Sequence, residues 1–216
     1  MMRVNLWGGG PTLALADYWQ QSGLLPDDPP ETQAFGYLFS DDATGTVTTR
    51  PYPTRYAMPL DKDQMIDGLL EAAAVVAGQA GLIEVDVERT ASGVPYVYSL
   101  MKIKQESGGV QYNLTLHLHA EHVQQVQGFF IEGHTTGMRD AAVYEIARQN
   151  DWLQQPTADD PMGGWARDPY TGLKTGFVMN MSELPDFDDQ FPAEQLSIPV
   201  DRGVSGDLRF GVLIAV

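Results

Sequence analysis

The chain has 216 residues, 43% of them apolar and 19% charged, and it contains no cysteine. A chain of this length and composition can bury one sizeable core, which argues against wholesale disorder. The missing thiols exclude disulfides, thiolate metal sites and a cysteine nucleophile.

Acidic residues outnumber basic residues 29 to 13, which gives a net charge of −16. The excess is spread along the chain, with −4 over Met1–Asp61, −5 over Lys62–Asn150 and −7 over Asp151–Val216. Because no basic stripe can displace counterions, we expect no nucleic-acid partner and no adhesion to an anionic membrane. A basic protein partner fits this charge, although solubility alone also explains it.

The first residues carry one arginine and no sustained apolar run, so they do not resemble a secretory signal. No apolar run is long enough to span a membrane. We therefore expect a cytoplasmic protein of bacterial type, and the sequence does not indicate its oligomeric state.

The N-terminal part is predicted to hold one helix and two strands. Residues 11–23 are expected to be helical, because Pro11 suits a first helical turn and Gly23 suits a helix end. A proline-rich loop separates this helix from strands predicted at 34–40 and 45–52.

Residues 60–81 form the clearest predicted helix. Asp61 is expected to be its N-cap, with Gln64 three residues later, and Gly81 is expected to end it. Apolar residues recur every three or four positions and predict one buried stripe. This stripe consists of Met65, Ile66, Leu69, Leu70, Ala73 and Val76.

Four strand patterns follow, separated by connections of hairpin length, and they predict an antiparallel meander. They lie at 82–89, 94–104, 110–120 and 123–133. In the first of them, Ile83, Val85 and Val87 alternate with acidic residues, which predicts that one face is solvated.

Residues 135–151 return to helical spacing, and the chain then changes character. Residues 151–205 are rich in Pro, Gly and Asp but keep several aromatic rings, which predicts an irregular wrap anchored to the domain. The apolar run at 206–216 is expected to be a strand buried on both faces. The whole chain, 1–216, is therefore predicted to be a single α+β domain, a mainly antiparallel sheet with helices packed on it plus this wrap.

Three of the four histidines, His117, His119 and His122, fall within six residues. Strand alternation predicts that His117 and His119 project from the same face. With His122 as a third ligand they could hold zinc and a water, and Glu121 as base would then give a metal-dependent hydrolase. The alternative, which we favour, is that the histidines form the wet polar face of a half-exposed strand.

The junction before the second helix is a candidate anion site. Thr135, Thr136 and the first helical N–H groups could bind an anion, with Arg139 in the first turn. Capping of the helix by Thr136, supported by Asp140, is the favoured alternative because it needs no ligand.

The wrap also carries candidate protein-binding residues. We predict that Trp165, Asp168, Tyr170, Asp186 and Asp188 contact a partner. The competing interpretation is that the rings only anchor the wrap to its own domain. Motifs of common nucleophile, zinc-protease and nucleotide-binding sites are absent from the sequence, so we assign no catalytic residue and no cofactor.

The segment from Gly93 to Glu145, GVPYVYSLMKIKQESGGVQYNLTLHLHAEHVQQVQGFFIEGHTTGMRDAAVYE, carries the pattern of hairpin-linked strands followed by a helix. With the helix that precedes it, this order resembles the fold shared by the photosystem subunit PsbP and the Ran-binding Mog proteins. The resemblance implies an α/β/α sandwich around an antiparallel sheet, which usually serves as a binding scaffold rather than a catalyst. No functional residue of those proteins can be matched here, so neither a photosynthetic nor a Ran-linked function is implied.

The leading hypothesis is a non-catalytic binding or adaptor protein for a basic protein. A narrower form is an acidic immunity protein that neutralises a cationic toxin. The alternatives are the hydrolase that uses the three histidines and the small-anion binder at 135–139.

Overall fold

A long antiparallel sheet runs through the centre of the computed structural model. The structure describes residues 2–7, 11–38, 43–75, 79–90, 92–106, 108–133, 137–172, 174, 178–184, 187 and 212–215. Its strands are β1 (Met2–Asn5), β2 (Thr12–Leu15), β3 (Gln20–Gln21), β4 (Gln33–Leu38), β5 (Thr44–Pro51), β6 (Ala80–Arg89), β7 (Pro95–Lys104), β8 (Val110–His119), β9 (Val123–Ile131) and β10 (Val212–Ala215).

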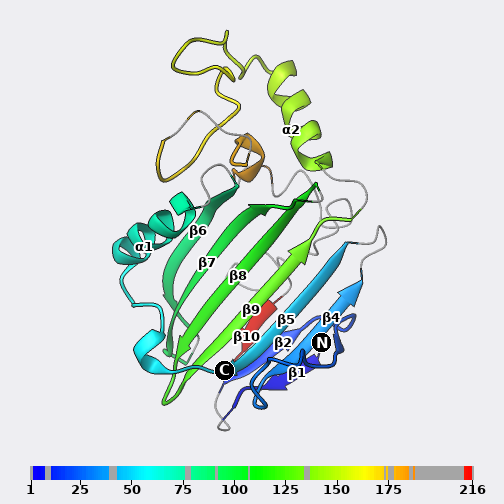
Figure 1. The fold of residues 1–216 in the computed structure, drawn as a ribbon, viewed down its shortest axis with the longest axis vertical. Coiled ribbons are helices and arrows are strands. Elements are labelled where there is room, and N and C mark those ends of the chain that lie inside the picture. Colours follow the sequence, from blue (N-terminus) through cyan, green and yellow to red (C-terminus); the bar gives the residue numbers. More distant parts are fainter. Residues whose placement is uncertain are drawn as a thin grey trace.

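Seven strands form the large sheet in the order β3-β4-β5-β9-β8-β7-β6, and three form a small sheet in the order β1-β2-β10 (Figure 1). Every recorded pairing is antiparallel. The meander from β6 to β9 is therefore confirmed. Its short connections join strands that are neighbours in both sequence and space, as hairpin-length loops require.

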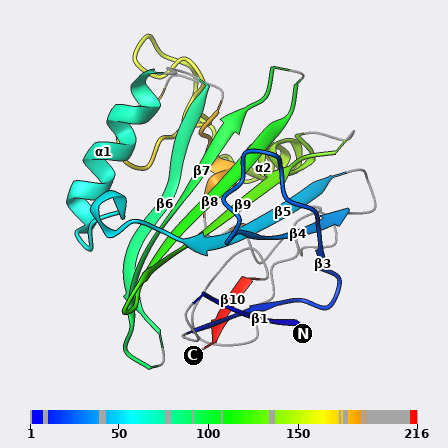
Figure 2. The same cartoon turned by 60° about the horizontal axis from the view of Figure 1, so that its bottom comes forward.

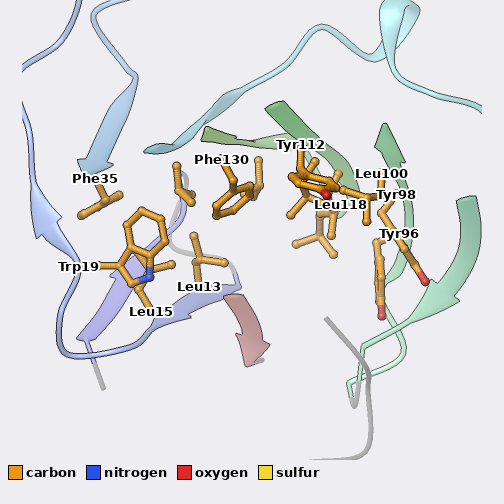
Figure 3. Close-up of a cluster of buried hydrophobic side chains, with 14 of the residues drawn as sticks. Leu13, Leu15, Trp19, Phe35, Tyr96, Tyr98, Leu100, Tyr112, Leu118 and Phe130 are labelled. Atoms are coloured by element: carbon orange, nitrogen blue, oxygen red, sulfur yellow. The ribbon is translucent and has the colours of Figure 1, made fainter. Parts of the chain in front are cut away.

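The two sheets face each other across the largest apolar core. Leu13 and Leu15 of β2 are fully buried in it, and the Trp19 ring packs edge-on against Phe130 of β9 at a centroid distance of 6.3 Å. Figure 3 shows these side chains meeting those of the large sheet, among them Leu118.

This core overturns the helix predicted at 11–23. The structure has strands β2 and β3 there, and Leu13 pairs with Val4 on one side and Ile214 on the other. Pairing with two strands that are distant in the sequence outweighs the weak local signals of Pro11 and Gly23, because local propensity is readily overridden by tertiary context.

Helix α1 (Lys62–Val75) lies on the opposite face of the large sheet, along β6 and β7 (Figures 1 and 2). Met65 packs there with Leu82 and Val97, and Ile66, Leu69 and Leu70 join the same cluster, so this part of the predicted apolar stripe is directed at the sheet. Val76 lies outside the described residues. The predicted N-cap is confirmed, since an Asp61 carboxylate oxygen accepts the N–H of Gln64 at 3.0 Å.

Two details of this region differ from expectation. Gly81 lies inside β6 and not at the end of the helix; a Cβ there would fall 2.2 Å from Met179 Cγ. The register of β6 against β7 shifts between Leu82 and Glu84. Ile83 therefore joins the core between the two sheets, whereas Val85 packs under α1.

Helix α2 (Met138–Gln149) lies beyond one end of the large sheet (Figure 1). It packs with the short 3-10 helix η2 (Met181–Glu183) through an apolar cluster that includes Val143, Ala147 and Phe187. A second 3-10 turn, η1 (Thr54–Tyr56), follows β5. In the described residues the layers are thus helix, large sheet and small sheet, rather than helices on both faces of one sheet.

The path from 151 to 187 is irregular wherever it is described, apart from η2 and one bridge between Ala166 and Asn180. Its rings meet other parts of the chain, as when Trp165 packs edge-on against Tyr144 of α2 at 5.1 Å. The predicted C-terminal strand includes β10, and the burial expected for its side chains lies outside what the structure describes. None of the described helices has the length and apolarity needed to cross a membrane.

Candidate functional site

The three histidines lie near one end of β8 but do not converge. The leucines of β8 enter the core between the sheets, whereas His117 and His119 project from the other face, as alternation predicts. His122 lies beyond the strand, with its ring 6.2 Å from that of Trp7. No three or more His, Asp or Glu side chains are grouped to hold a metal ion in the described part of the chain, which leaves the hydrolase alternative without a ligand set there.

His117 is covered, so the expectation of a wet face was wrong for this residue, whereas His119 is half-buried and His122 is exposed. The His117 side chain is only 2% exposed, because the segment after β5 crosses it. Met58 donates its N–H to His117 Nδ1 at 2.7 Å and accepts from His119 Nε2 at 3.1 Å. Burial, and then the nearby charges of His119 and Arg50, lower the pKa of His117 to about 4. At neutral pH this ring is therefore an uncharged structural acceptor.

The predicted anion site is only partly described. Thr135 and Thr136 lie outside the described residues, and the N-cap of α2 is Gly137, at φ 71°, rather than Thr136. A glycine suits this position because the left-handed backbone conformation is strained for other residues. Arg139 donates from Nε to the carbonyl of Ser182 at 2.8 Å, so it links α2 to η2.

A buried ionic cluster near η2 was missed by sequence reasoning. Lys102 of β7 is 1% exposed, and its Nζ lies 2.6 Å from Glu183 and 3.6 Å from Asp140. Ser182 donates its hydroxyl to the same Asp140. Burial alone would lower the pKa of Lys102, but Glu183 and Asp140 outweigh burial and the pKa is raised. The available signal was alternation, which places Lys102 on the same side of β7 as Leu100.

The predicted partner-binding residues of the wrap have structural contacts. Trp165 packs in the cluster of α2. Asp168 accepts the N–H groups of Tyr170 and Thr171, which forms a tight turn. This turn directs the Tyr170 hydroxyl to the N–H of Val85, on the outer edge of β6, at 3.2 Å. Asp186 and Asp188 lie outside the described residues.

This same edge of the molecule is acidic. Three exposed carboxylates of α1 lie at one side of the large sheet with three of β6, one of them exposed and two half-buried, and we call this set the acidic edge. Its members are Asp63, Asp67, Glu71, Glu84, Asp86 and Glu88. Two cations, Lys62 and Arg89, lie among them in the sequence of α1 and β6. Lys62 is held by Asp86 at 3.0 Å, and Arg89 donates to the Gly93 carbonyl. Because six carboxylates face only these two cations, the edge keeps a marked negative excess.

Two carboxylates of the acidic edge are held in place from the core side. The hydroxyl of Tyr98 donates to Glu84 at 2.6 Å, and that of Tyr96 donates to Glu88. Burial and these hydrogen bonds raise the pKa of both tyrosines, so they remain donors at neutral pH. The negative charge of β6 is therefore carried by oriented side chains.

No family model matches the chain, and a search of curated proteins returned no match. Among solved structures, the chain is similar to the PsbP protein CyanoP from Synechocystis sp. PCC 6803, with a TM-score of 0.43 and 12% identity over 68% of this chain and 89% of that chain. It is also similar to PA94, a protein of unknown function from Pseudomonas aeruginosa, with a TM-score of 0.37 and 14% identity over 65% and 99%. Similarity at this level gives a distant resemblance to a PsbP-like fold, and no residue takes a role from it.

Proposed function

We propose that the protein is a non-catalytic binding protein whose acidic edge receives a basic segment of a protein partner in the cytoplasm. The observation that carries this proposal is the gathering of six carboxylates from α1 and β6, with only two cations between them, both already engaged. Charge complementarity of this kind speeds association and favours partners whose binding segment carries positive charge.

The geometry supports recognition by side chains rather than by strand addition. β6 is an outer strand of the large sheet, but its Val85 N–H is already bonded to Tyr170. An added strand would need that donor. Asp168 holds in place the turn whose Tyr170 hydroxyl bonds to this edge. A cationic toxin neutralised by an acidic immunity protein is the narrower form of the proposal.

The test compares two variants with the same change in net charge. One variant neutralises α1 through Asp63→Asn, Asp67→Asn and Glu71→Gln. The matched control neutralises exposed carboxylates elsewhere, through Asp27→Asn, Glu31→Gln and Glu106→Gln. Each protein is used to capture partners from a lysate of the source cell at low salt, and the captured proteins are identified by mass spectrometry.

We expect that the wild-type chain and the control capture a basic protein and that the α1 variant does not. Raising the salt concentration should release the captured protein. Capture of no basic protein, or equal losses in both variants, would contradict the proposal. Circular dichroism spectra of all three proteins must coincide, because the comparison requires intact folds.

A further inference from the structure

A series of buried hydrogen-bonding groups crosses the face of the large sheet that carries His117. The N–H of Met58 donates to His117 Nδ1, and His117 Nε2 faces the side-chain nitrogen of Gln125 at 2.9 Å. The Gln125 oxygen accepts from Arg50 Nε at 2.7 Å. The side chains of His117 and Gln125 are 2% and 4% exposed, so bulk water does not solvate these two side chains.

These three contacts need three acceptors, and the four groups supply only two. A neutral imidazole has one acceptor nitrogen and an amide has one oxygen, whereas the Met58 N–H and the Arg50 Nε–H only donate. Since Met58 occupies Nδ1, the proton of His117 is on Nε2 and faces the amide nitrogen of Gln125. If the Gln125 amide is turned over, its oxygen accepts from His117, but its nitrogen, a donor, then faces the Nε–H of Arg50, also a donor. The excess of donors therefore remains. One further acceptor would complete the set.

Arg50 is the member of this set that can meet a ligand. Its side chain is only partly buried, and its guanidinium carbon lies 5.6 Å from the centroid of the Tyr52 ring, which limits its orientations. Beyond the bond from Nε to Gln125, Arg50 has no hydrogen bond or ion pair with any residue that the structure describes. Its planar group therefore presents several donors in a fixed direction.

The strands around Arg50 place no carboxylate on this face. The side chains that share the face on β5, β9 and β8, here called the polar face, bear hydroxyl, amide, imidazole, guanidinium and apolar groups. They are Thr44, Thr46, Thr48, Arg50, Val123, Gln125, Gln127, Phe129, Ile131, Gln111, Asn113, Thr115, His117 and His119. β6 is four strand spacings from β5, about 19 Å. That exceeds the screening length of about 8 Å at physiological salt, so the three carboxylates of β6 repel an anion at Arg50 only weakly.

We propose that the polar face binds a small oxyanion, the carboxylate or phosphate group of a ligand, on Arg50 and Gln125. In the bound state Arg50 donates to the oxyanion, Gln125 turns its oxygen to the Nε2–H of His117, and its amide nitrogen donates to the same oxyanion. Every donor in the set then has an acceptor, and the positive charge of Arg50 is matched. This site is separate from the acidic edge and does not depend on the function proposed for that edge.

The test is a titration of the full-length protein, followed through the ¹⁵N-resolved signals of the arginine Nε–H and glutamine amide groups. The probes are sodium acetate, sodium phosphate and, as the neutral analogue of acetate, acetamide, all at constant ionic strength set with chloride. The expected result is a saturable shift of the Arg50 and Gln125 signals with acetate, phosphate or both, and no shift with acetamide. Comparing the two anions distinguishes a carboxylate site from a phosphate site.

Three variants identify the residues responsible. Arg50→Lys keeps the charge but removes the planar fork, and it should weaken binding about tenfold. Arg55→Lys is the matched control, because Arg55 also lies over a tyrosine ring, at 4.6 Å from the centroid of Tyr56, and it should leave affinity unchanged. Gln125→Glu supplies an internal carboxylate to both Arg50 and His117, so it should abolish binding.

The proposal is overturned if neither anion produces a saturable shift, or if chloride produces the same shift. It is equally overturned if Arg50→Lys and Arg55→Lys bind alike. Thermal melts show which variants remain folded. If Gln125→Glu does not fold, the comparison of Arg50→Lys with Arg55→Lys decides the outcome.

Discussion

Lys102 and His117 are buried polar residues of neighbouring strands, and the protein accommodates them in opposite ways. Lys102 projects from β7 toward Glu183 and Asp140 and keeps its charge, with its pKa raised. His117 projects from the other face of β8, where its ring contacts Met58 and Gln125 instead of a carboxylate, and burial lowers its pKa to about 4. A buried ionisable group is thus either matched with opposite charge or kept neutral, and the neighbouring strands decide which.

The contrast extends to hydrogen bonding. Around Lys102 acceptors are abundant, because Asp140 accepts a hydrogen bond from the Ser182 hydroxyl and also lies 3.6 Å from the Nζ of Lys102. Around His117 donors are in excess, because the single oxygen of Gln125 accepts from Arg50 and only the amide nitrogen of Gln125 faces His117. The first site therefore stabilises the fold through matched charges, whereas the second retains capacity for an added acceptor.

The largest effect is expected from Lys102→Met. This substitution removes the cation that lies 2.6 Å from Glu183, whose side chain is 8% exposed. We expect a loss of about 3–5 kcal/mol in the free energy of unfolding, because an uncompensated buried charge is costly. Urea denaturation at pH 7 measures it.

The control for Lys102→Met removes both charges together. Glu183→Gln in the Lys102→Met background should recover part of the lost stability, because no buried charge then lacks a partner. If the single and double variants are equally unstable, the lost stability belongs to packing and the matched-charge account of this site fails.

A smaller effect is expected from protonation of His117. Its pKa is about 4 in the folded chain and about 6.5 in an unfolded chain. As the pH falls below about 6.5, the unfolded chain binds the proton first, so stability is complete above that pH and declines towards pH 4. We expect a loss of about 2–3 kcal/mol over this interval, measured by urea denaturation at several pH values.

His117→Gln isolates this contribution from that of the carboxylates, which also titrate at low pH. The glutamine oxygen can accept the Met58 N–H but does not titrate, so the stability of the variant should fall less steeply between pH 6.5 and 4.5. If the stability of the two proteins falls equally with decreasing pH, the pKa of His117 is not lowered in the folded chain.

Local patterns predicted the elements that form between near neighbours in the sequence. The helix with its Asp61 cap and the four-stranded meander were predicted correctly because capping, periodicity and turn length depend on residues that are close together in the sequence. The same strand alternation correctly placed His117 and His119 on one face.

Contacts between distant segments could not be predicted in this way. The cover over His117 comes from Met58, 59 residues earlier, and the partner of Lys102 comes from Glu183, 81 residues later. The strand at Thr12–Leu15 depends on pairing with β10 near the other end of the chain. Which distant segment meets which is set by the packing of the whole chain, and local propensity carries little of that information.

The smallest effect is expected from Lys62→Met, which removes a lysine–carboxylate pair from the surface rather than the interior. Lys62 lies 3.0 Å from Asp86, a contact chemically like that of Lys102 with Glu183, but the two side chains are 47% and 39% exposed. Water solvates both charges in either state, so the free energy of unfolding should change by only about 0–1 kcal/mol, and by less at high salt. Urea denaturation at low and high salt measures this. A loss as large as that of Lys102→Met would mean that burial does not distinguish the two pairs, and the contrast between matched interior charge and solvated surface charge would fail.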